Sequence, residues 1–157
     1  MLRFFVRSVR AAASKFPSLL RDRTGAAAIE FAVMSPAIFA LAIGMLKFGI
    51  AVQHYILVTN AAAQGALTMG MARGSSTPYG STTTTISSSA PGLTSSSITT
   101  TVKIGGTACS SDSACSALLT AGATVTVKVS YPCDLSIMGV NYMTTCTVSS
   151  TSGQIVQ

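Results

Sequence analysis

The chain has 157 residues, enough for one domain or for a small domain with a membrane segment. Charged residues make up 9% of it and hydrophobic residues 48%, a balance that is unusual for a soluble cytosolic protein and indicates a membrane or an assembly. The net charge is +6, but six of the ten basic residues precede Gly25, so no nucleic-acid partner is expected, because phosphate binding needs several Lys or Arg on one folded surface.

The N-terminal zones predict a leader and a membrane helix. Residues 1–25 are basic and amphipathic, and the next zone is almost wholly apolar. Phe31–Val52 is 22 residues long, which as a helix spans about 33 Å against a hydrocarbon core of about 30 Å. Positive charge before the span stays cytoplasmic, so we expect an inner-membrane protein, surrounded by membrane lipid, whose C-terminal part is in the periplasm.

The helix is expected to continue past the membrane, so that residues 26–73 form one helical region. Small and apolar residues recur there at alternating steps of three and four, which predicts one packed seam. The seam consists of Tyr55, Val58, Ala62, Gly65 and Met69. It can pack on the exported domain or on neighbouring subunits. Arg73-Gly74 and then Pro78 are expected to end the helix.

Residues 74–157 are expected to form an exported, Ser/Thr-rich β domain. Between Ser75 and Thr101, 18 of 27 residues are Ser or Thr, which predicts a loop with a short helix near Thr82–Ser89. Apolar and polar residues alternate over 98–104 and 123–131, and Tyr142–Ser150 is a weaker third strand. The predicted fold class is α+β: a long N-terminal transmembrane helix followed by a small disulfide-stapled antiparallel β domain.

The four cysteines all follow the predicted membrane helix. In an oxidising periplasm an even number favours two disulfides, and three connectivities are open. We favour Cys109–Cys115, closing a short loop, and Cys133–Cys146, closing a hairpin-like excursion. A zinc site is the rival, but the spacing lacks a Cys-x-x-Cys pair and the single histidine, His54, lies at the membrane boundary. We therefore expect no metal and no cofactor.

One motif carries the functional prediction. Gly25 ends the basic segment, and five positions later Glu30 places a single carboxylate inside an apolar helix. An ionised carboxylate in hydrocarbon costs several kcal/mol unless it is paired. Cleavage after Gly25 would create an ammonium group on Ala26, about one helical turn away. The alternative is that Glu30 sits at the headgroup level, favoured by the helix dipole, and does nothing further.

These residues resemble the TadE-like pseudopilin domain of tight-adherence pilus systems. The similarity covers about residues 21–70 and rests on Gly25–Phe31, the Ala-Val-Met-Ser-Pro run that ends at Pro36, and Lys47-Phe48-Gly49. Lys47 departs from the family, which often has an acid there. The resemblance implies cleavage by a prepilin peptidase between Gly25 and Ala26, with Glu30 and Phe31 acting in subunit assembly. It also implies contacts with other pilin or pseudopilin subunits and with the inner-membrane assembly platform.

Four classes of function are compared for this sequence. The first is a pseudopilin or minor pilin acting in pilus assembly and surface attachment. The main alternative is an uncleaved, single-pass membrane-anchored periplasmic binding or adhesion module outside any filament. An ordinary secretory signal peptide cut near Ala40 or Ala42 is disfavoured by the length of the span. An enzyme is not expected, because the exported part offers two acids and no nucleophile–base pair.

Overall fold

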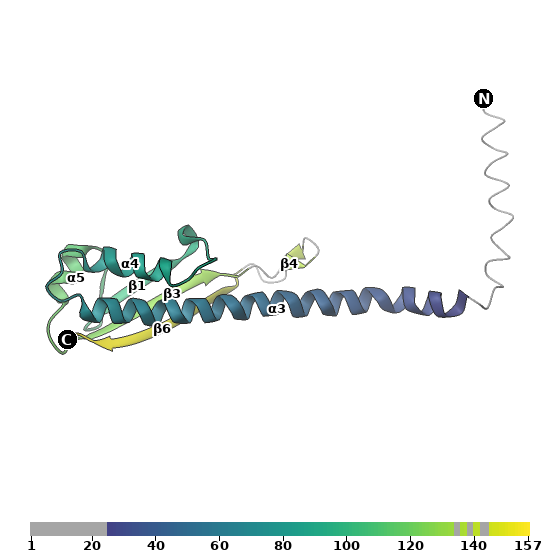
Figure 1. Ribbon diagram of the computed structural model, residues 1–157, viewed down its shortest axis with the longest axis horizontal. Coiled ribbons are helices and arrows are strands. Elements are labelled where there is room, and N and C mark those ends of the chain that lie inside the picture. The colour runs from purple at the N-terminus through teal and green to yellow at the C-terminus, as the bar shows by residue number, and fades with distance from the viewer. Residues whose placement is uncertain (1–24, 134–135, 138–139, 142–144) are drawn as a thin grey trace, which may run out of the picture. The chain divides into compact units, whose positions relative to one another are not determined.

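The structure, a computed structural model, describes residues 25–133, 136–137, 140–141 and 145–157. Its elements, several of which are labelled in Figure 1, are α3 (Ala26–Met71), α4 (Pro78–Ser88), η2 (Ser95–Ser97), β1 (Thr99–Ile104), β2 (Thr107–Cys109), α5 (Asp112–Leu118), β3 (Thr124–Pro132), β4 (Ser136–Ile137), β5 (Val140–Asn141) and β6 (Thr147–Ile155). The predicted class, α+β with a long apolar N-terminal helix and a small antiparallel sheet, is confirmed. The basic segment 1–24 lies outside the described residues.

Two compact units divide the chain between Ile43 and Gly44, within α3. In the first unit, the described residues are the first part of α3, which continues through Pro36. The second unit contains the rest of α3 together with all the strands and the shorter helices. The core of the protein lies in this second unit.

The sheet of the second unit has the order β2-β1-β3-β6, and every neighbouring pair is antiparallel. The predicted alternation in β3 is confirmed: Val125, Val127 and Val129 are buried, and Lys128 between them is exposed. The third strand was predicted too early. It is β6, which begins at Thr147, while residues 142–144 of the predicted strand lie outside the described residues.

The short hairpin of β1 and β2 was not predicted. Ile104 pairs with Thr107, which leaves Gly105 and Gly106 as a two-residue loop. Their φ values are 57° and 86°, a conformation that glycine adopts without steric cost and that matches the twist of a tight hairpin. The sheet therefore gains a fourth strand at its edge.

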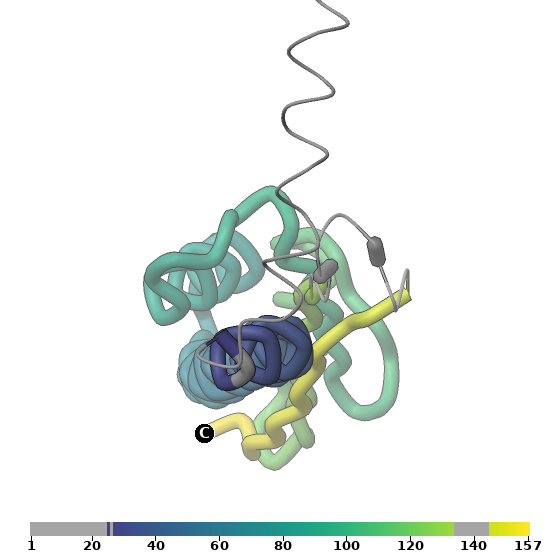
Figure 2. The backbone as a smooth tube through the Cα atoms, turned by 90° about the vertical axis from the view of Figure 1, so that its right-hand side faces the viewer, coloured from purple at the N-terminus to yellow at the C-terminus, as the bar shows by residue number. Residues whose placement is uncertain are grey.

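The predicted seam of α3 is largely confirmed. Val58, Ala62, Gly65 and Met69 are buried, but Tyr55 is half exposed, because the packed face continues through Ala61 and Ala66 rather than back to Tyr55. A Cβ atom on Gly65 would lie 2.7 Å from Cγ1 of Ile86 in α4 and 3.4 Å from Cγ1 of Val127 in β3. Figure 2, which looks along α3, shows α4 and the strands flanking this helix. Small residues therefore set how closely α3 approaches both elements.

The Ser/Thr-rich segment contains the short helix predicted near Thr82–Ser89: it is α4, which begins earlier, at Pro78. This helix buries Pro78, Thr82 and Ile86 along one face. Hydroxyl groups along the helix donate to backbone carbonyls of the preceding turn; for example, Thr82 Oγ1 donates to Pro78 O at 2.8 Å and Thr85 Oγ1 to Ser81 O at 3.0 Å. The polar side chains thus meet their hydrogen-bonding needs locally, and few apolar residues suffice to hold the helix on the core.

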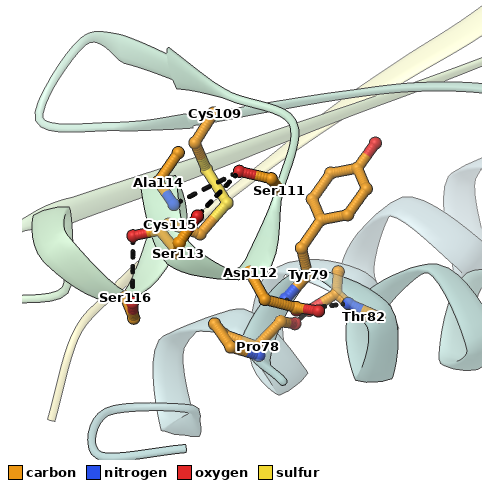
Figure 3. Close-up of a disulfide and its surroundings, with 11 residues drawn as sticks. Pro78, Tyr79, Thr82, Cys109, Ser111, Asp112, Ser113, Ala114, Cys115 and Ser116 are labelled. Carbon is orange, nitrogen blue, oxygen red and sulfur yellow. Dashed lines mark hydrogen bonds between the residues drawn. A yellow bond between two sulfur atoms is a disulfide. The ribbon is translucent and has the colours of Figure 1, made fainter. Parts of the chain in front are cut away.

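The N-terminus of α4 is capped from a distant part of the chain. Its own N-cap residue, Thr77, makes no side-chain capping bond. Instead, Oδ1 of Asp112 accepts from the backbone N–H groups of Tyr79 at 2.8 Å and Gly80 at 2.9 Å. Asp112 starts α5, whose own cap is Ser111, accepting from the N–H of Ala114. Figure 3 shows this carboxylate directed at the first turn of α4.

Two disulfides join the pairs that the sequence favoured, Cys109–Cys115 and Cys133–Cys146. The first ties the end of β2 to α5, next to the Asp112 cap (Figure 3). The second brackets the segment that contains β4 and β5, and its ends are also joined by the bond from Cys133 N–H to Cys146 O. Each bridge is expected to contribute about 2–3 kcal/mol, mainly by restricting the unfolded chain.

The capping arrangement predicts that Asp112→Ala lowers the stability of the full chain in detergent by about 1.5–3 kcal/mol, because two helix N–H groups lose a charged acceptor. Asp112→Asn keeps an oxygen acceptor and should lose only about 1 kcal/mol. Thermal and denaturant unfolding followed by circular dichroism measure both effects. Ser116→Ala is the control, since that exposed hydroxyl bonds only within α5. An Asp112→Ala variant as stable as the control would contradict the cap.

Candidate functional site

The predicted cleavage position lies at the start of α3. Gly25 is half-buried and immediately precedes the helix, which begins at Ala26. A Cβ atom on Gly25 would meet nothing within 4 Å, and its φ is not in the left-handed range. Neither space nor backbone conformation in the described structure demands glycine at this position.

Glu30 and Phe31 lie in the second turn of the same helix, and both are exposed. Positions 26 and 30 are four residues apart, so they are neighbours on one helix face, with Cβ atoms about 5–6 Å apart. A charge on the amino group of residue 26 would thus come within reach of the Glu30 carboxylate. The structure brings together the four predicted assembly and cleavage residues, and the four cysteines belong to the other unit.

The surface around Glu30 is apolar on all sides of the helix. Large hydrophobic side chains along it are between 39% and 73% exposed. They are Ile29, Phe31, Val33, Met34, Ile38, Phe39, Leu41, Met45, Leu46, Phe48, Ile50, Val52, Tyr55 and Ile56. α3 is long and apolar enough to cross a membrane, and its most apolar window has no buried residues. This exposure differs from that of a core helix in a soluble domain and fits membrane anchoring.

The cysteines offer no thiolate for a metal, because all four are paired with each other. His54, the histidine of the rival zinc reading, instead packs its ring edge-on against Tyr131, with the ring centroids 5.3 Å apart. The hydroxyl oxygen of Tyr131 accepts from the N–H of Thr94 at 3.4 Å. His54 therefore contributes to the packing between α3 and the end of β3.

A polar hollow on the sheet was missed by the sequence analysis. It lies on the sheet face opposite the core and is lined by Thr101, Lys103, Thr126, Lys128 and Thr151, from β1, β3 and β6. The signal was present in the strand alternation: residues that alternate with buried valines must point to the opposite face. The strand register, which makes the two lysines diagonal neighbours on β1 and β3, could not be predicted from the sequence.

Comparison with known proteins finds a family match in the helical part of the chain. Residues 25–67 match the family described as TadE-like protein, which confirms the resemblance found from the residues. The match begins at Gly25 and ends within α3, so it covers the exposed apolar surface and most of the buried seam. It supports a role related to tight-adherence pili. No curated protein and no solved structure matches the chain.

The exposure pattern predicts which peptides contact lipid. A photoreactive probe that partitions into the bilayer should label peptides from residues 27–52 of the reconstituted chain strongly. Peptides covering β3 and β6 serve as the internal control and should remain nearly unlabelled, because their exposed side chains are mostly polar. Mass spectrometry of the digested protein measures the distribution. Equal labelling of both regions would contradict a membrane position for the apolar part of α3.

Proposed function

We propose that this chain, whose residues 25–67 are TadE-like, is a pseudopilin or minor pilin of a tight-adherence pilus, cleaved after Gly25 by a prepilin peptidase. It is held in the inner membrane by α3, with its sheet unit in the periplasm, and acts in pilus assembly and surface attachment. The carrying observation is the start of α3 at Ala26, directly after an unconstrained glycine and one turn before a lone exposed carboxylate.

Glu30 has a physical role in this proposal. Cleavage leaves a positive ammonium group at the N-terminus of α3, where the helix dipole is itself positive and disfavours it. The Glu30 carboxylate, one turn further on, compensates that charge within its own chain or in a neighbouring subunit. Pairing between subunits would fix the axial position of one helix against the next, because an unpaired carboxylate among apolar side chains is costly.

The exposed apolar surface of α3 suits two successive environments, the membrane and the filament. In the membrane, lipid covers the side chains from Ile29 to Ile56, and in a filament the same side chains pack against other pilin or pseudopilin helices. Transfer from lipid to a helix bundle changes little apolar exposure, so the step depends on packing and on the Glu30 pair. The assembly platform in the inner membrane is the proposed partner for that transfer.

The first test is the N-terminus of the protein recovered from its own cell envelope. Mass spectrometry should find a chain beginning at Ala26, and Gly25→Val should abolish the cut. Gly44→Val is the matched control: it places the same side chain inside α3, at a glycine where a Cβ also meets nothing within 4 Å. A native chain that still carries Met1 would support an uncleaved anchored module. A cut near Ala42 would indicate a secreted protein.

The second test separates the charge of Glu30 from its shape. Glu30→Ala and Glu30→Gln should both reduce pilus assembly by at least tenfold, as about 1.4 kcal/mol of lost pairing already gives that factor. Glu30→Asp should retain most assembly, because the carboxylate remains. Ser35→Ala is the control for a polar change on the same stretch of helix. Counts of surface pili and the amount of membrane-inserted subunit are measured together. Normal piliation by Glu30→Ala would remove the pairing role.

A further inference from the structure

We propose that the outer face of the sheet binds an acidic polysaccharide, at the hollow formed by Lys103, Lys128 and their threonine neighbours. This inference does not depend on the pilus role, since it rests only on the sheet of the second unit. The hollow has a volume of about 400 Å³, within the range of ligand sites, which is about 300–1,000 Å³.

The strand register builds the hollow from two rows. In the first row, Thr101 lies opposite Lys128, and Lys128 lies opposite Thr151. In the second row, Lys103 lies opposite Thr126, and Thr126 lies opposite Gly153. The two lysines are therefore diagonal neighbours on adjacent strands, about 7–8 Å apart at the backbone. Gly153 has no side chain, so the second row is open at β6.

No acidic residue of the described strands offsets the positive charge of this face. None of the four strands β1, β2, β3 and β6 contains an acidic residue, as their sequences show. Asp112, the acid of α5, is already bonded to the N-terminus of α4. Two like charges on neighbouring strands repel each other, and an anionic ligand between them would relieve that repulsion. Charge complementarity therefore favours a ligand that carries repeated negative groups.

The threonines favour a carbohydrate over other polyanions. Thr101, Thr126 and Thr151 come from three different strands and present hydroxyl groups, each able to donate and accept, around the lysines. That set suits the alternating hydroxyl and carboxylate groups of a polyuronate. Nucleic acid would require more cations, because its affinity comes mainly from neutralising several phosphates. Tyr131, the aromatic residue of these strands, packs against His54 on the other face, so acidic groups rather than ring stacking must supply the affinity.

The experiment measures binding of the purified full chain, in detergent micelles, to immobilised alginate, a polymer of uronic acids. We expect binding that weakens as the salt concentration rises. Combining Lys103→Gln and Lys128→Gln should lower the affinity about tenfold, because it removes two exposed ion pairs of about 0.7 kcal/mol each. Arg73→Gln removes an exposed charge elsewhere and should bind like the wild type. Gly153→Leu should also weaken binding without a change of charge, by filling the open row.

Four outcomes would overturn the proposal. The first is wild-type affinity in the double lysine variant, which would assign binding to other basic residues. The second is equal binding to neutral dextran, and the third is equal or tighter binding to double-stranded DNA or polyglutamate with the same lysine dependence. The fourth is no alginate binding at all. Unfolding curves of the lysine and Gly153 variants should match the wild type, since these positions are on the exposed sheet face and a Cβ at Gly153 meets Val125 O at an ordinary 3.5 Å.

Discussion

The close packing of the small-residue face of α3 is the interaction on which the second unit depends. Ala61, Ala62 and Ala66 are fully buried there, and Gly65 leaves just enough room for Ile86 and Val127. One helix thereby joins α4, which buries Pro78 and Ile86, to the inner face of the sheet, where Val125, Val127 and Val129 are buried. A domain in which Ser and Thr are so abundant can be stable because its apolar residues are gathered in one core.

The surface that α3 presents changes along its length, although the helix itself is continuous. Before the sheet unit its large side chains, such as Phe39 and Leu46, are exposed, and beyond Val58 the face toward the sheet consists of small residues. Lipid or other helices require a broad apolar surface, and a sheet requires a narrow close-fitting face. Both kinds of surface therefore belong to one helix, α3 (Ala26–Met71).

The sequence was sufficient to predict the elements whose buried residues recur with a simple period. The alternation around Val127 and the three-four spacing from Val58 to Met69 each reflect one buried face, and the cysteine pairing followed from loop length. The sequence was not sufficient for interactions between distant segments. The Asp112 cap joins residues 33 positions apart, and it stabilises the first turn of α4, which begins at Pro78 and so before the short helix predicted near Thr82–Ser89. The register that pairs Thr101 with Lys128 is likewise a property of the assembled sheet.

The order of the elements along the chain has a consequence for folding. α3 precedes every strand, and its end at Gly70 accepts a bond from the N–H of Gln157. Contacts of such high sequence separation make folding slow, because a long loop must close before they stabilise the protein. The helix that forms the centre of the core is thus synthesised before the described strands that cover it. During that interval its alanine face and the apolar surface next to it are both available to chaperones, to lipid or to aggregation.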